Sequence, residues 1–305
     1  MSTYSGIDVS KYQQKIGWSK VDAHGIDFAL IRIGMGNVAS QIDPYFKTNV
    51  EQALAHGLNV GGYYFGYATS VSDAQKEADV CNQLLQPYKG KFTYPIAYDY
   101  EYDSIEYFKK VMGRAPTNAE TTAFAKAFLD RLKSYGWFVN IYTNIDFIRS
   151  GKFSAEIIKS YDVWLADYSG APDYPCYIQQ TGSKGTVPGI SGNVDMDVSF
   201  RDYPSMIKSG GYNGFTKQPQ TIVSADTTTT VNLKRGQTYQ LKTTCAQQPK
   251  VWAGTENVVT ILPRYRSGND DLWYIVGIGN VGAGTGIFTA ADKENGLKRF
   301  VVNII

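Results

Sequence analysis

The chain has 305 residues, of which 43% are hydrophobic and 19% are charged, which is typical of an ordinary globular protein with one large and one small domain. Its formal net charge of +2 is too close to zero to favour nucleic acid as a partner, and no apolar run approaches the roughly 18 residues needed to cross a bilayer. The three cysteines lie far apart and form no metal or redox motif.

The first part of the chain, residues 1–206, alternates short apolar runs with helical patterns. The runs predict strands at Ser5–Val9, Phe28–Gly34, Asn59–Tyr67, Tyr94–Glu101, Phe138–Asn144, Val163–Tyr168, Cys176–Gln180 and Val194–Phe200. The helical patterns fall at Trp18–His24, Pro44–His56, Ser72–Gln86, Thr117–Tyr135 and Ser154–Lys159. This alternation predicts an α/β fold in which eight strands close into an irregular, TIM-like barrel with about five helices. In such barrels the reactive side chains lie at the C-terminal ends of the strands.

The character of the sequence changes after residue 206. Residues 207–218 are rich in glycine and polar residues and predict a linker. Residues 219–305 contain short strand patterns separated by turns and no helical pattern, which predicts a small all-β sandwich. The expected strands are Thr227–Leu233, Thr238–Thr244, Val258–Tyr265, Leu272–Ile278, Gly286–Thr289 and Phe300–Ile304.

Four carboxylates fall at the ends of predicted barrel strands: Asp8, Asp99, Glu101 and Asp195. A carboxylate within an apolar strand is costly unless it is paired or used in function. Asp99 and Glu101 are two residues apart and therefore project from the same face of a strand. Two acids held that close raise the pKa of one of them, and a protonated acid beside an ionised one is what glycoside hydrolysis requires.

Other interpretations of these acids stay open at this level. An Asp-x-Glu motif alone is weak, and the four acids converge only if the barrel closes. A structural polar cluster or a site for a hard cation such as Ca²⁺ or Mg²⁺ would use the same residue types. The two histidines, His24 and His56, lie at predicted helix ends and do not support a transition-metal site, so we predict no metal and no cofactor.

The sequence resembles the family 25 glycoside hydrolases, the Chalaropsis-type lysozymes, over about its first 200 residues. The segments that carry the resemblance are Gly6–Gln13, Gly25–Gly34, Gly61–Phe65, Ile96–Glu101, Ile141–Thr143, Trp164–Ala166 and Gly185–Asp195. The resemblance implies cleavage of the β-1,4 bond between N-acetylmuramic acid and N-acetylglucosamine in peptidoglycan. It assigns the proton-donor role to Glu101 and the role of its stabilising partner to Asp99, and it places Asp8 and Asp195 in the same site.

The resemblance also suggests residues that line the substrate groove. They are Arg32, Tyr64, Tyr142, Tyr168 and Gln179, and each tyrosine has barrel packing as an equally plausible role. Many family members carry Trp-Gln-Tyr on the seventh strand, whereas this chain has Ile178-Gln179-Gln180. The loss of both aromatic residues leaves the shape of one groove wall in doubt.

The expected partner is bacterial peptidoglycan, with residues 219–305 binding an anionic wall polymer or, as the alternative, serving as a spacer or an assembly element. Aromatic and basic residues that could meet such a polymer are Tyr239, Trp252, Arg264, Tyr265, Arg266, Trp273 and Tyr274, although a sandwich core would use the aromatic ones equally well. The N-terminus shows no signal-peptide pattern. We therefore expect a phage endolysin or a bacterial autolysin that is made in the cytoplasm and reaches the wall after release, for example through a holin. The competing hypotheses are a wall-binding protein without activity and a glycosidase of chitin-like substrates.

Overall fold

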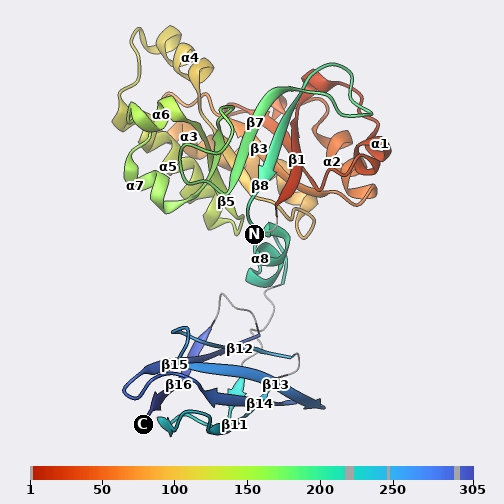
Figure 1. Cartoon of the computed structure of the whole chain (residues 1–305). Helices are drawn as coiled ribbons and strands as arrows, with labels where there is room; N and C mark the ends of the chain where they lie inside the picture. The colour runs from red at the N-terminus through yellow and green to blue at the C-terminus, as the bar shows by residue number, and fades with distance from the viewer. Residues whose placement is uncertain (1–2, 217–222, 246–247, 292–295) are drawn as a thin grey trace. The chain divides into compact units, whose positions relative to one another are not determined.

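The computed structural model describes residues 3–216, 223–245, 248–291 and 296–305, and it divides the chain into two compact units, residues 1–218 and 219–305 (Figure 1). Within these described ranges, no helix has the length and apolar character needed to cross a membrane.

The first unit is built on a closed barrel whose strands follow one another in chain order. The strands are β1 Tyr4–Val9, β2 Phe28–Met35, β3 Asn59–Phe65, β4 Ile96–Asp99, β5 Val139–Asn144, β6 Asp162–Ala166, β7 Ile178–Gly185 and β8 Val194–Ser199. Strands β1 to β7 run parallel, whereas β8 is antiparallel to both β7 and β1. The start of β8 therefore meets the C-terminal ends of its two neighbours, at the mouth of the barrel.

Eight α-helices accompany this barrel in the described residues, and most of them pack around its outside (Figure 1). They are α1 Trp18–Ala23, α2 Phe46–Ala55, α3 Val71–Leu85, α4 Tyr102–Met112, α5 Asn118–Ser134, α6 Ile145–Arg149, α7 Ala155–Ser160 and α8 Tyr203–Gly210. The predicted barrel is confirmed, and five of these helices match the predicted helical patterns. Helices α4, α6 and α8 were not predicted, because the first two follow their strands almost without a loop and the third straddles the boundary between the predicted barrel and the predicted linker.

Strand alternation separates two apolar layers and decides which side chains reach the inside of the barrel. On β4, Ile96 and Tyr98 face the helices, where the Tyr98 ring stacks on Phe128 of α5 with ring centroids 4.2 Å apart. Ala97 belongs instead to the cluster inside the barrel. Because successive side chains of a strand point to opposite faces, Asp99 follows Ala97 to the inside.

Helix α8 closes the end of the barrel where β1 begins (Figure 1). Its Tyr203 and Ile207 are fully buried in the inner cluster. Asn213, three residues beyond the helix, is also buried; its side chain accepts a hydrogen bond from the backbone N–H of Phe138 (2.7 Å) and donates to the carbonyl oxygen of Phe92 (2.9 Å). The predicted linker at 207–218 is thus wrong for residues 207–213, which are part of the barrel unit because they supply its apolar floor.

The second unit contains two four-stranded sheets, with strand orders β10-β16-β15-β12 and β13-β14-β11-β9. The strands are β9 Ser224–Ala225, β10 Val231–Leu233, β11 Thr238–Thr244, β12 Lys250–Ala253, β13 Val259–Ser267, β14 Asp270–Gly277, β15 Gly284–Ala290 and β16 Leu297–Ile304. One apolar cluster takes residues from both sheets, including Leu241 and Ile275 from one and Ile287 and Val302 from the other. The all-β sandwich is therefore confirmed, with β9 and β12 as strands that the pattern did not predict.

Candidate active site

The four predicted carboxylates lie at the mouth of the barrel. Asp8 on β1 is the register partner of Asp195 on β8, and this pairing depends on the antiparallel direction of β8. Asp99 is the last residue of β4. Glu101 lies beyond the strand, at the N-cap of α4, where its backbone N–H donates to Ser104 Oγ (3.1 Å). The predicted strand end at Glu101 is therefore two residues too long, and the helix start now fixes the position of Glu101.

Burial and mutual repulsion perturb these acids. Burial, followed by the neighbouring Asp197 and Asp195, raises the pKa of Asp8 well above its usual value. Burial and then Glu101 raise the pKa of Asp99, and burial, Asp103 and Asp195 raise the pKa of Glu101. Groups that interact this strongly titrate as a set, so the mouth retains protons at pH values at which isolated carboxyls would have lost them.

Arg32 of β2 supplies the positive charge that faces this set. Its guanidinium is buried, pairs through Nε with Asp43 Oδ2 at 2.8 Å, and lowers the pKa of Asp99 against the effect of burial. Its Nη2 is buried and has no hydrogen-bond partner among the residues that the structure describes, and the same holds for Asp99 Oδ1. Unsatisfied buried polar atoms are costly and are found where a ligand can use them.

A hydrogen-bonded network links two of the predicted tyrosines to Asp8. The hydroxyls of Tyr142 and Tyr168 donate to Gln180 Oε1 at 3.0 and 2.9 Å. The same Gln180 side chain also binds Asp8, because its Nε2 donates a hydrogen bond to Asp8 Oδ2 at 2.7 Å. Tyr142 and Tyr168 therefore lie at the mouth with the carboxylates, and Tyr168 keeps 55% of its surface exposed.

Two predicted substrate-binding residues do not face the mouth. Tyr64 is fully buried on the helix side of β3, where its hydroxyl donates to the Gly36 carbonyl oxygen at 2.7 Å. Gln179 is also buried, and its Nε2 donates to the carbonyl oxygens of Asp167 and Gly170 at 2.7 and 2.8 Å. These predictions are wrong by one residue, since their neighbours Tyr63 and Gln180 occupy the inner face.

Sequence reasoning also missed Asp197, which is buried below Asp8 and Asp195. The signal was present in the sequence, because Asp197 is two residues after Asp195 and shares its face of the strand. Once Asp99 and Asp8 define the inner face, the same alternation assigns Tyr63, Gln180 and Asp197 to it.

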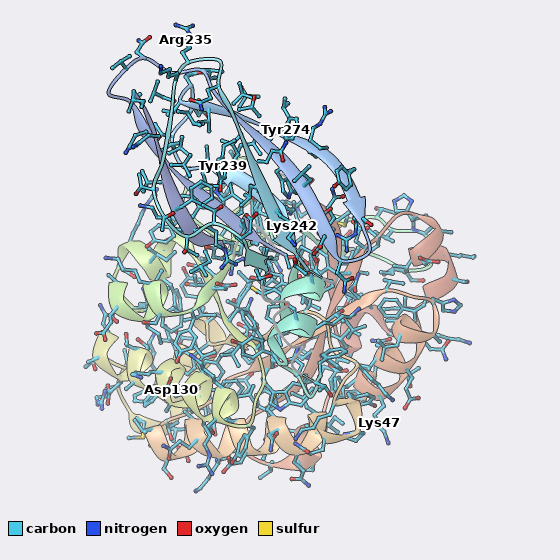
Figure 2. The ribbon with its side chains drawn as sticks, turned by 90° about the horizontal axis from the view of Figure 1, so that it is seen from below. Lys47, Asp130, Arg235, Tyr239, Lys242 and Tyr274 are labelled. Atoms are coloured by element: carbon cyan, nitrogen blue, oxygen red, sulfur yellow. The ribbon has the colours of Figure 1, made fainter. Side chains whose placement is uncertain are left out.

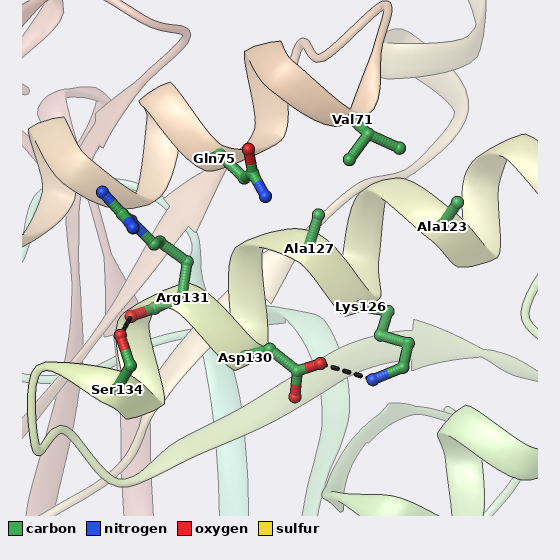
Figure 3. Close-up of a pocket in the computed structure, with 8 residues that line it drawn as sticks. All are labelled: Val71, Gln75, Ala123, Lys126, Ala127, Asp130, Arg131 and Ser134. Carbon is green, nitrogen blue, oxygen red and sulfur yellow. Dashed lines mark hydrogen bonds and ion pairs between the residues drawn. The ribbon is translucent and has the colours of Figure 1, made fainter.

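Two of the cavities formed by the described residues lie outside the barrel interior. A groove of about 520 Å³ between α3 and α5 is lined by Val71, Gln75, Ala123, Lys126, Ala127, Asp130, Arg131 and Ser134 (Figure 3). Its charges are already paired, Lys126 with Asp130 and Arg131 with Asp79, which leaves no reactive group there.

The second cavity, of about 510 Å³, adjoins the mouth and is lined by Gly36, Asn37, Val38, Gln41, Tyr67, Thr69, Asp73, Glu77, Asp103 and Tyr107. Asp103 influences the pKa of both Asp99 and Glu101, so this cavity and the carboxylates are neighbours. Its polar lining extends the mouth toward α3 and α4.

The acids thus converge at the mouth of the barrel, the end at which the reactive groups of such barrels lie, and comparison with known proteins identifies the family. The family model for glycosyl hydrolases family 25 matches residues 7–188. The chain belongs to glycosyl hydrolase family 25. Among curated proteins, YegX of Escherichia coli K12 is 28% identical over 208 residues, which is 64% of this chain and 69% of YegX.

Solved structures of related fold extend this result. The modular autolysin LytC of Streptococcus pneumoniae matches with a TM-score of 0.57 and 24% identity. The match covers 65% of this chain and 47% of LytC. The lysozyme of Streptomyces coelicolor matches with a TM-score of 0.55 and 22% identity, over 71% of this chain and 100% of that one. The spore cortex lytic enzyme SleM of Clostridium perfringens matches with a TM-score of 0.55 and 14% identity, over 99% of this chain and 98% of SleM. At these identities the comparisons establish a shared fold.

Proposed function

We propose that this family 25 member is an N-acetylmuramidase, which cleaves the β-1,4 bond between N-acetylmuramic acid and N-acetylglucosamine in peptidoglycan. The observation that carries the proposal is the pair of acids at the mouth, the buried Asp99 and the half-buried Glu101, whose pKa values are both raised, with Arg32 opposing the rise at Asp99. One acid that holds a proton beside one that is ionised is the requirement of glycoside hydrolysis.

In the proposed mechanism Glu101 protonates the glycosidic oxygen as the bond breaks. Positive charge then develops at the anomeric carbon, and Asp99 stabilises it directly or through the acetamido group of the substrate. Glu101 next accepts a proton from the water that completes hydrolysis. Asp8, held by Gln180, and Asp195 contribute negative potential around the same point.

The type of new reducing end tests this proposal. Purified bacterial walls should lose turbidity and gain N-acetylmuramic acid ends on treatment with the full chain. New N-acetylglucosamine ends would contradict the muramidase assignment, and cleavage of chitin oligomers in preference to walls would favour the glycosidase of chitin-like substrates. Binding without any new ends would support a wall-binding protein that has no activity.

We further propose that the second unit binds an anionic wall polymer through the outer face of β13 and β14. There the Arg264 guanidinium lies over the Tyr274 ring, 4.7 Å from its centroid, and Tyr265 keeps 64% of its surface exposed. Three of the other aromatic residues considered above do not contribute to this face. Trp273 is buried and donates to Thr243 Oγ1 at 2.9 Å, and the rings of Tyr239 and Trp252 pack against Phe300 and Phe288.

A double change on this face should weaken wall binding without affecting catalysis. In the full chain, Arg264→Ala with Tyr265→Ala removes a cation and an aromatic surface, so retention on isolated walls should fall several-fold and become less sensitive to salt. Sedimentation with walls at low and high salt measures this. Arg235→Ala is the matched control, because Arg235 is exposed in the same unit but lies away from Tyr274 (Figure 2). Unchanged retention of the double variant would favour a spacer role.

The proposed function also implies where the protein acts. We propose that it is made in the cytoplasm and acts on the cell wall after release, which for an endolysin would occur through an opening made by a holin. Autolysins that leave the cell by other means would fit the same molecule.

A further inference from the structure

The inner face of β8 carries a second aspartate, Asp197, that the mechanism above does not use. It lies two residues beyond Asp195, opposite Gly6 of β1 and Gln180 of β7, and only 2% of its surface is exposed. The side chain is therefore too deep to touch a glycan at the mouth. Asp197 can influence the reaction only through a neighbouring residue that does reach the mouth.

The contacts of Asp197 identify that neighbour as Asp8. Asp197 Oδ1 accepts a hydrogen bond from Trp164 Nε1 at 2.8 Å. Its other oxygen, Oδ2, receives no N–H or O–H group from elsewhere in the described part of the chain. On the neighbouring strand β1, Asp8 lies two residues from the register partner of Asp197 and so on the same inner face, and its carboxyl is the group whose hydrogen bonding influences the pKa of Asp197. Two carboxyls can form a hydrogen bond only when one of them holds a proton, because an ionised carboxylate has no donor.

Among the described residues, the groups that most influence the pKa of Asp8 and of Asp197 include no cation, because Arg32 at the mouth is paired with Asp43 and acts on Asp99. From β1 and β8 the charged groups that face Asp197 are Asp8 and Asp195, and both are acids. From β7 and β6 it meets the neutral Gln180 and Trp164. Asp8 in turn faces Asp195, Asp99 and the neutral Tyr63 hydroxyl in addition to Asp197. Two adjacent negative charges at this depth would be strongly disfavoured, and burial accordingly raises the pKa of Asp197 to about 8.

We propose that Asp197 is a positioning residue: Asp8 and Asp197 share one proton as a hydrogen-bonded pair, and this bond holds the Asp8 carboxyl in place at the mouth. Gln180 Nε2 holds Asp8 from the other side. Two fixed hydrogen bonds leave Asp8 one orientation, and the shared proton limits the negative charge that accumulates near Asp99 and Glu101. The catalytic consequence rests on the proposed function, whereas the shared proton does not.

Asparagine and leucine at position 197 separate this role from simple packing. Asn has the shape of a protonated Asp: its Oδ1 can accept from Trp164 and its Nδ2 can donate to Asp8. Asp197→Asn should therefore keep turnover within about threefold of the wild type, whereas Asp197→Leu, which cannot bond to Asp8, should lose about tenfold or more, as expected for one hydrogen bond to a charged group. A folded Asn variant that is as inactive as the Leu variant would overturn the proposal, because the amide would then fail to replace the shared proton.

A thermal measurement tests the shared proton without using activity. A carboxyl whose folded pKa is raised stabilises the fold below its unfolded pKa of about 3.9, and this contribution is lost as pH rises toward the folded pKa. The melting temperature of the wild type should thus fall relative to that of Asp197→Asn between about pH 4 and the folded pKa of about 8. Asp22→Asn, which removes an exposed carboxyl on α1, controls for the loss of one negative charge. A wild-type-to-Asn difference that stays constant across this range would overturn the proposal even if the enzyme proves to act on another glycan.

Discussion

Replacement of Glu101 by glutamine is expected to lower turnover of purified walls by about 10²–10⁴-fold, the usual contribution of a general acid. Glutamine has the shape of glutamate but no acidic proton, so bond cleavage loses its proton donor. The start of α4 should survive, because the bond from the backbone N–H at position 101 to Ser104 Oγ is unchanged and the side-chain oxygen of glutamine can still accept from the Ser104 backbone N–H, as that of Glu101 does. Initial rates of reducing-end formation at saturating wall concentrations measure the loss.

The stability of this variant gives an independent check that the loss is chemical. The folded pKa of Glu101 is raised, so the wild type loses stability as pH rises through that pKa, and Glu101→Gln does not. At neutral pH the variant should melt at the same temperature as the wild type or higher. Glu106→Gln changes an exposed carboxyl on the same helix and serves as the matched control. Activity of the Glu101 variant close to that of Glu106→Gln would remove Glu101 from the proton-donor role.

The barrel and the four candidate acids could be predicted from the sequence because both follow from short patterns. Apolar runs of strand length alternate with amphipathic helices, and each of the four acids interrupts or ends such a run. The resemblance to a family then linked Asp8 and Asp195, which are 187 residues apart in the chain. Their direct pairing in the β1–β8 register depends on the reversed direction of β8, and no local pattern encodes strand direction.

The errors in the groove have one physical origin. On a strand, a shift of one residue moves a side chain to the opposite face. Tyr63 and Tyr64 are both tyrosine, and Gln179 and Gln180 are both glutamine, so residue type gives no information on which of each pair faces inward. The alternation resolves these pairs only once other residues fix which face points inward, such as Asp99 on β4 beside Tyr63 and Ile178 two residues from Gln180. The linker prediction after residue 206 was wrong for a different reason, since its glycines suggested a linker while Ile207 and Asn213 are buried in the barrel unit.

Asp99→Asn is the second change expected to have a large effect, with turnover reduced by about 10²–10³-fold, the range seen when one preorganised electrostatic group is removed from an active site. Asparagine fits the same space at the end of β4 but carries no negative charge to stabilise the developing positive charge. The variant should also shift the pH–rate profile. Asp99 and Glu101 repel each other, so removing the charge at position 99 lowers the pKa of Glu101 and moves the alkaline decline of activity to lower pH.

The same change should make the fold more stable, and this combination distinguishes a functional acid from a structural one. Asp99 is buried, its Oδ1 lacks a partner in the described part of the chain, and its folded pKa is raised, so its ionised form costs stability at neutral pH. Melting curves of Asp99→Asn should lie above those of the wild type, by an amount that grows as pH rises. Asp103→Asn is the control, because Asp103 affects the pKa of both acids from an exposed position and its loss should move the pH profile without a large fall in maximal rate. If Asp99→Asn is less stable than the wild type and its activity falls only in proportion to unfolding, Asp99 is a structural acid, and the stabilising charge must then come from Asp8 or Asp195.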